Sequence, residues 1–220
     1  MLSDFQSIVD NLVPDPGTLL AAGSRDQAID LAVLRYSTDR PRPAIEEVTS
    51  PGGEFLDLPP GWETDFSLLT EVRNSSGLEL EAELDLTLSG VKIRLASPLT
   101  VGAMAEILYT VRHQVDAGQD TVPVKDREAV CYWAASVLLE QMATLYAGHR
   151  QPTVQADSVD FDNKSRDMAA RARRLRDQYL NHLGVDPKKN TAAGAVVNMD
   201  RPHTRWDEQI RRAAARSGKW

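Results

Sequence analysis

The sequence is poor in cysteine and contains no long apolar run. Cys131 is the only cysteine among 220 residues, so no disulfide can form within the chain and the fold must depend on packing. No stretch approaches the roughly 20 consecutive apolar residues of a membrane-spanning helix, so we expect no membrane partner. Asp4, Asp10 and Asp15 interrupt the basic-then-apolar pattern of a secretory signal. These features favour a soluble protein that is made in the cytoplasm.

The sequence also lacks the usual ingredients of a catalytic or metal site. His113, His149, His182 and His203 include no pair at the i, i+4 spacing of a helical zinc site, and no second cysteine could complete a thiolate cluster. The glycine-rich phosphate-binding motifs and the nucleophile elbow of hydrolases are missing too. We therefore expect no enzymatic activity, no catalytic residue, no cofactor and no metal ion.

Two isolated features have simple structural interpretations. Asp157, Asp160 and Asp162 could suggest a metal site, but the glycine and terminal glutamate of a calcium loop are missing. Carboxylates before a helix are explained by their favourable interaction with the helix dipole. Cys131 lies in an apolar helical stripe beside Trp133, so we expect a buried and inert thiol.

Helical patterns occupy both sides of a different central region. Apolar residues at i, i+3, i+4 and i+7 spacing predict helices at 3–12, 25–37, 126–147 and 160–183. Ser3 is a suitable N-cap for the first, and Gly148 and Gly184 are typical of the ends of the last two.

The central region, residues 44–122, has the short alternating runs of β-strands. Turn residues separate expected strands at 44–49, 54–58, 67–73, 78–88, 91–95 and 106–114. Leucine and alanine occupy every second position of 78–88, which predicts a strand with one buried face. Residues 97–105 fit either a short helix or a strand. Trp62, after a Pro-Pro-Gly turn, either lies on a loop or anchors this β-domain.

These patterns predict an α+β fold: mainly an α-helical bundle with an inserted small antiparallel β-domain and an extended C-terminal tail. The expected segments are the N-terminal helices of the bundle at 1–43, the inserted β-rich domain at 44–122, two long bundle helices at 123–184 and the tail at 185–220.

Charge is unevenly distributed along the chain. The net charge is −14 over residues 1–161 and +7 over 162–220. The tail has too few apolar residues to offset a chain-entropy cost of about 1–2 kcal/mol per residue, so it should become ordered only on a partner. Trp and Arg are enriched at interface hot spots. The expected partner-binding residues are Arg201, Arg205, Trp206, Ile210, Arg211, Arg212, Arg216, Lys219 and Trp220. The alternative is a solvated, frayed terminus.

Three stretches of the helical regions resemble a known protein family. They are RDQAIDLAVLRYSTDRP at 25–41, YAGHRQPTVQADSVD at 146–160 and KSRDMAARARRLRDQYL at 164–180. They are similar to the head–tail connector (adaptor) proteins of tailed phages. The resemblance covers residues 24–41 and 123–184, and the β-rich middle is similar only in character to the β insertion that such bundles often carry.

This resemblance implies a structural role at the head–tail interface of a virion. It implies a ring of neighbouring copies, commonly twelve, beneath a portal protein that receives the C-terminal tail. The next connector or tail-completion protein would bind on the other side. Genomic DNA would pass through the lumen with only transient, non-specific contact. An acidic body suits this role, because a protein binds DNA tightly only when its basic side chains neutralise phosphates.

An alternative hypothesis is a DNA-binding module that uses the basic C-terminal helix. Arg171, Arg173, Arg174 and Arg176 follow one another along that helix. The same arginines could instead pair with acidic neighbours or form a solvated surface. A third hypothesis is an enzyme whose site follows none of the familiar motifs.

Overall fold

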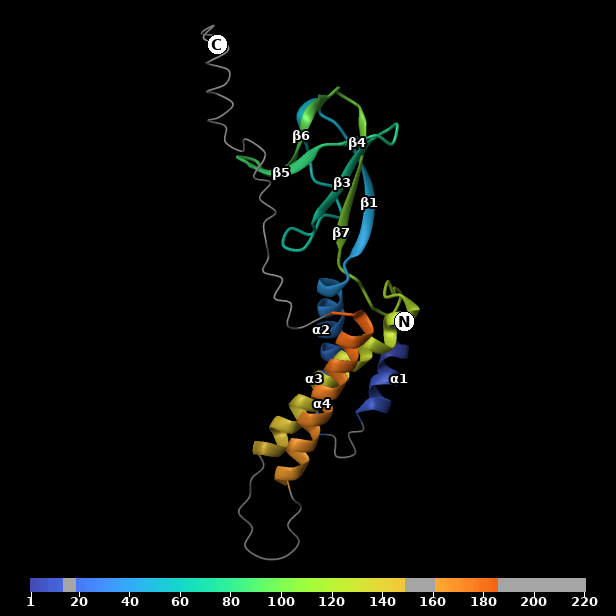
Figure 1. Ribbon diagram of the computed structural model, residues 1–220, viewed down its shortest axis with the longest axis vertical. Coiled ribbons are helices and arrows are strands. Elements are labelled where there is room, and N and C mark those ends of the chain that lie inside the picture. The colour runs from blue at the N-terminus through green and yellow to red at the C-terminus, as the bar shows by residue number, and fades with distance from the viewer. Residues whose placement is uncertain (14–18, 149–160, 186–220) are drawn as a thin grey trace, which may run out of the picture. The chain divides into compact units, whose positions relative to one another are not determined.

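Helices from two separate parts of the chain pack around one apolar core. The computed structural model describes residues 1–13, 19–148 and 161–185. Its helices are α1 (Leu2–Leu12), α2 (Ser24–Asp39), α3 (Arg127–Gly148) and α4 (Phe161–Leu183), with a 3₁₀-helix, Val124–Asp126, before α3. α3 and α4 lie side by side, and α1 and α2 both contact α3 (Figure 1). The four predicted helices are confirmed with small differences at their ends, but the N-cap of α1 is Met1 and not Ser3.

The helical core gives α4 one buried side and one exposed side. α3 contributes small side chains, including Ala129, Ala134 and Ala135, which allow its neighbours to approach closely. α4 contributes Ala172, Leu175, Tyr179 and Leu183, which share one face of the helix. The opposite face of α4 is exposed.

Residues 42–111 form two antiparallel sheets with a core of their own. The strands are β1 (Arg42–Thr49), β2 (Gly53–Leu56), β3 (Leu69–Asn74), β4 (Glu79–Leu80), β5 (Ala82–Thr87), β6 (Gly90–Leu99) and β7 (Met104–Val111). Their orders are β1-β7-β3-β4 and β2-β6-β5 (Figure 1). Leu56, Val72, Ile93 and Ile107 are buried in this second core. Trp62 packs against it with its ring 5.6 Å from that of Tyr109, so it anchors the β region.

The expectation of a mainly α-helical bundle with a small inserted β-domain is wrong. About 44% of the structure is helix and about 28% is strand, in four helices and seven strands among the described residues. The fold is therefore α+β with two substantial parts. The physical reason is long-range pairing: β7 is bonded to both β1 and β3, so the turn-separated runs assemble around a full core. The expected C-terminal tail beyond Val185 lies outside the described residues.

Two ambiguous stretches of the β region are settled by the strand pairing. β6 extends to Leu99 and β7 begins at Met104, so residues 97–105 are strand on both sides of a turn. The run 78–88 is two strands and not one. Leu80 pairs with Val72 in the first sheet, whereas Ala82 pairs with Leu95 in the second. The chain therefore crosses between sheets at Glu81.

Candidate interaction surfaces

A buried carboxylate, Asp126, joins the ends of three helices. It is 1% exposed and accepts hydrogen bonds from the Tyr36 hydroxyl at 2.7 Å, the Arg40 guanidinium at 3.2 Å and His182 Nε2 at 2.9 Å. Burial alone would raise the pKa of Asp126, but the bonds from Tyr36 and His182 and the charge of Arg40 outweigh it and lower the pKa. An ionised Asp126 therefore holds the start of α3 to the ends of α2 and α4.

His113 makes the neighbouring contact, between the end of β7 and α2. Its backbone N–H donates to Ser37 Oγ at 2.9 Å, and its ring lies 4.9 Å from that of Tyr36. Ring atom Nε2 lies 3.1 Å from the carbonyl oxygen of Arg40, and Nδ1 lies 2.9 Å from the carbonyl oxygen of Thr121 and 3.2 Å from Thr121 Oγ1. A neutral ring can donate to only one of the two carbonyl oxygens. Burial nevertheless lowers the pKa of His113, because it disfavours the charged ring more than the two carbonyl oxygens favour it.

Potential metal ligands do not gather among the described residues, and the single cysteine is buried. Among them, no three His, Cys, Asp or Glu side chains gather as metal ligands, and no helix is long and apolar enough to cross a membrane. The side chains of Asp157, Asp160 and Asp162 lie outside the described part of the chain. Cys131 is buried as expected. Burial raises the pKa of its thiol to about 12, so the reactive thiolate does not form near neutral pH.

The residues expected to bind a partner all belong to the C-terminal tail. Arg201, Arg205, Trp206, Ile210, Arg211, Arg212, Arg216, Lys219 and Trp220 lie outside the described residues. Their role therefore stays a prediction.

The basic helix α4 uses some of its arginines within its own subunit. Arg171 donates to the carbonyl oxygen of Leu12 at 2.9 Å. Arg176 forms an ion pair with Glu140, and its guanidinium lies 5.5 Å from the centre of the Trp133 ring. Two of the four arginines behind the DNA-binding hypothesis are thus occupied.

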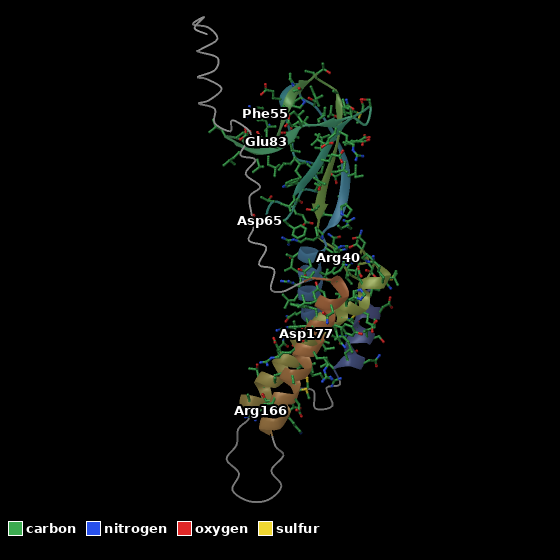
Figure 2. All side chains as sticks on the ribbon, in the orientation of Figure 1. Arg40, Phe55, Asp65, Glu83, Arg166 and Asp177 are labelled. Carbon is green, nitrogen blue, oxygen red and sulfur yellow. The ribbon has the colours of Figure 1, made fainter. Side chains whose placement is uncertain are left out.

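The remaining basic side chains form an exposed surface on α4. Arg166, Arg173 and Arg174 are exposed and make no ion pair with any described residue. Together with Ala170, they lie opposite the buried face of α4, where Asp167 and Asp177 are also exposed. We call Arg166, Ala170, Arg173 and Arg174 the arginine face. Figure 2 shows where Arg166 and Asp177 lie along α4.

The hairpin of β5 and β6 leaves a row of apolar side chains uncovered. Leu84 pairs with Ile93 and Leu86 with Val91, so all four lie on the same face of the sheet. Ile93 is fully buried, whereas Leu86 is 79% exposed and Leu88, in the turn, is fully exposed. The apolar face therefore continues beyond the core that it helps to form. We call Leu84, Leu86, Leu88 and Val91 the hairpin tip. Sequence alternation predicted the apolar face but wrongly predicted its burial here.

Comparisons with known proteins add no relative. A scan against protein-family models finds no matching family, and a search of the curated proteins finds no significant match.

Proposed function

We propose that this chain is a structural, non-enzymatic subunit of the head–tail connector of a tailed phage. Copies form a ring, commonly of twelve, beneath the portal protein at the head–tail interface of the virion. The ring joins the capsid to the tail and lines the DNA conduit. The C-terminal tail binds the portal, and the next connector or tail-completion protein binds the other side.

The observation that carries this proposal is the direct contact between two stretches that resemble connector proteins. The stretch 25–41 covers α2, and 164–180 lies within α4. Both helices contribute to one core with α3. The Tyr179 hydroxyl of α4 donates to Asp39 of α2 at 2.7 Å, and Arg40 donates to the carbonyl oxygen of Leu183 at 3.1 Å. The resemblance thus falls on one packed unit and not on unrelated segments.

The charge of the described body also favours a conduit. Residues 42–111 carry twelve acidic and four basic side chains. An acidic surface near passing DNA keeps the contact weak, because affinity for DNA grows with the number of phosphates that the protein neutralises.

Portal binding by the tail gives the first test. A chain lacking residues 187–220 should keep the helical circular dichroism of the full chain but lose binding to the purified portal. In the full-length chain, Trp206→Ala combined with Trp220→Ala should weaken portal binding at least tenfold, with Trp62→Phe as a control for the loss of a tryptophan elsewhere. Unchanged portal binding by the truncated chain would contradict tail docking. Electron microscopy of the wild-type complex that shows no ring on the portal would contradict the connector role.

The second candidate function is DNA binding through α4, favoured by the arginine face. A gel shift should then appear at low salt and weaken steeply as salt rises, and Arg173→Glu with Arg174→Glu should abolish it. No shift at low salt excludes this function. The occupied Arg171 and Arg176 make a tight grip on DNA less favourable than the connector role.

A further inference from the structure

The first strand of the β region leaves one edge of the four-stranded sheet open. β1 is the outermost strand, with β7 on its inner side, and no other described helix or strand packs extensively against it (Figure 1). All eight of its residues pair with β7 without a bulge. Among the other described edge strands, β4 has two residues, β2 is irregular and β5 has six residues. A long, regular edge of this kind invites pairing with another strand.

The backbone groups on the outer side of β1 have no partner. Just after β1, the N–H of Ser50 donates to the carbonyl oxygen of Ala103, on the β7 side, at 2.7 Å. Because successive residues of a strand point their N–H and C=O groups to alternate sides, every second residue back from Ser50 also faces β7. The residues between them, including Ile45, Glu47 and Thr49, face away from β7. None of these three N–H groups is bonded to a described residue.

The side chains of β1 leave one apolar and one basic group to be covered. Ile45 is 62% exposed and lies directly opposite Leu108 of β7, so an apolar row reaches the open edge. On the other face of β1, the buried Nε atom of Arg42 has no hydrogen-bond partner among the described residues. A buried donor without an acceptor is costly. The edge therefore fits a strand that brings an apolar side chain to one face and a carboxylate to the other.

We propose that β1 of one copy pairs antiparallel with β1 of a second copy, about a two-fold axis at Ile45. The two four-stranded sheets then join into one. Ile45 lies opposite Ile45 of the second copy, with Leu108 beside it in each copy, and Glu47 lies opposite Pro43. The outward N–H groups of Ile45 and Glu47 donate to the carbonyl oxygens of Ile45 and Pro43 of the second copy.

The charges on β1 select this register over its neighbours. Shifting one strand by two residues places Glu46 opposite Glu46 of the second copy, and a further shift of two residues does the same for Glu47. Like charges directly opposite destabilise a strand pair. A shift in the other direction places Pro43, which has no N–H, opposite Ile45 and leaves fewer hydrogen bonds. In the register centred on Ile45, no two like charges lie directly opposite.

The same register supplies the carboxylate that Arg42 lacks. Glu46 lies opposite Ala44 of the second copy, and Arg42 of the second copy is its diagonal neighbour on the same face, within reach of a long side chain. The other diagonal neighbour is Glu46 of the second copy, which the right-handed twist of the strands places farther away. Within its own chain, Glu46 accepts only from the far side of β1, where the N–H of Gly61 lies 3.2 Å from its carboxylate. Each copy thus offers the charge that the other needs.

The pairing goes beyond the proposed connector role and concerns the free chain. A two-fold contact closes on itself, so the ring of a connector would use other surfaces. β1 follows α2 after two residues, and the paired strands run in opposite directions, so the helices of the two copies lie at opposite ends of the pair. A contact made mainly by one strand of each copy is small, and the dimer should be weak and depend on concentration.

Amide exchange of the full chain, followed by NMR, tests which edge is covered. The N–H groups of Ile45 and Glu47 should exchange more slowly as the protein concentration rises. Those of Leu84 and Leu86, on the open edge of β5, are the matched control and should not change. Slowing at β5 alone would overturn the proposal. Slow exchange at Ile45 that is independent of concentration would mean that the same chain covers the edge, and would overturn it as well.

Cysteine cross-linking tests the register. Cys131 is the only native cysteine and is buried, so the background is low. Ile45→Cys should give disulfide-linked dimers under mild oxidation, because opposite residues of this type have Cα atoms about 5.5 Å apart, within the range of a disulfide. Glu47→Cys is the matched control. Its two copies lie four residues out of register, roughly 13 Å apart along the strands, and should not cross-link. Dimers from Glu47→Cys but not from Ile45→Cys would overturn the proposal.

Substitutions measure the energetic role of the edge. Ile45→Lys places two like charges opposite each other and should weaken dimerisation at least tenfold in analytical ultracentrifugation, with the melting temperature unchanged. Arg42→Glu should also weaken it, because the new carboxylate faces Glu46 of the second copy. Arg94→Glu, in the other sheet, changes the net charge equally and should leave dimerisation unchanged. Dimerisation of Ile45→Lys as strong as that of the wild type would contradict the pairing.

The wild-type results separate this inference from the connector role. If the free chain stays monomeric at every concentration but forms rings on the portal, the pairing fails and the connector role stands. If no ring forms on the portal while Ile45→Cys gives dimers, the connector role fails and the pairing stands.

Discussion

Among the described polar residues, we expect the loss of Asp126 to lower the free energy of unfolding the most. Three donors from Tyr36, Arg40 and His182 converge on its carboxylate, and each would lose its acceptor on substitution. We expect Asp126→Ala to lower the free energy of unfolding by about 2–3 kcal/mol, because hydrogen bonds to a buried charge are the costly ones to break. Tyr36→Phe removes one donor and should cost about 1 kcal/mol.

Urea unfolding followed by circular dichroism measures both changes. The control is Asp57→Ala, since Asp57 forms an exposed ion pair with Lys92 and such pairs contribute less than about 1 kcal/mol. A loss for Asp126→Ala no larger than that for Asp57→Ala would contradict a structural role for the cluster.

His113 should make stability depend on pH in a window below neutrality. Burial lowers its pKa in the folded chain below the ordinary 6.5. As pH falls below about 6.5, the unfolded chain takes up the proton first, so the free energy of unfolding falls until folded His113 is protonated as well. Asp126 acts at lower pH: its pKa is lowered, so its contribution is complete above its unfolded value of 3.8 and is lost only as pH falls further.

A series of urea unfolding curves between pH 7.5 and 5 measures this effect. His113→Gln should unfold more easily at pH 7.5 but show a flatter dependence across that window. His203→Gln, in the C-terminal tail, is the matched control. An identical slope in His113→Gln and the wild type would contradict the assignment.

At the scale of single elements, the end of α4 depends on one glycine. Gly184 has a φ of +69° and is followed by Val185, whose N–H donates to the carbonyl oxygen of Leu180 at 3.0 Å. This is the Schellman arrangement that closes a helix. A Cβ on Gly184 would meet no neighbour, so Gly184→Ala should cost only the strain of a left-handed backbone, about 1–2 kcal/mol.

Thermal unfolding tests this prediction, with a melting temperature about 2–6 °C lower as the expected result. Gly148→Ala is the control. Gly148 ends α3 without a positive φ and without a close neighbour, so alanine there should be neutral or slightly stabilising. A lower melting temperature in the control than in Gly184→Ala would show that the backbone at Gly184 is not the reason.

Elements with a strong local signal were the part of the fold that sequence could predict. The apolar stripe of α3 and the glycine that ends α4 depend only on residues that are near in the sequence. Both were therefore predicted correctly. The run 78–88 shows the limit of prediction from local sequence patterns. Its alternation predicts an apolar face, but whether that face is covered depends on strands that pair from elsewhere, and the outer leucines are uncovered. Periodicity alone could not place the break at Glu81 either.

At the scale of the whole described chain, the polar contacts were beyond sequence reasoning. Asp126 is joined to Tyr36 and His182, which lie far away in the sequence and carry no shared motif. Only the packing of α2, α3 and α4 brings them together. The hairpin tip could have been suspected, because a leucine-rich run with a two-residue turn indicates a hairpin, but its exposure follows from the sheet order.

The described chain has two apolar cores, and their separation leads to a last prediction. Leu138 is buried in the helical core and Ile107 in the β core, and the clusters share no residue. The contacts that His113 makes with α2 and Arg40 are polar or aromatic. Truncating a buried leucine or isoleucine to alanine costs about 2–5 kcal/mol. We therefore expect each truncation to loosen mainly its own part of the chain.

Hydrogen–deuterium exchange read by mass spectrometry can separate the two parts. Ile107→Ala should speed exchange in peptides from 42–111 by at least tenfold and leave α3 and α4 nearly unchanged, and Leu138→Ala should do the reverse. Ile45→Ala, at an exposed position of β1, is the control and should change neither. Equal acceleration of both regions by Ile107→Ala would show that the His113 contacts bind the cores into one cooperative unit. In that case the helical part and the β region of residues 42–111 would unfold together in one transition.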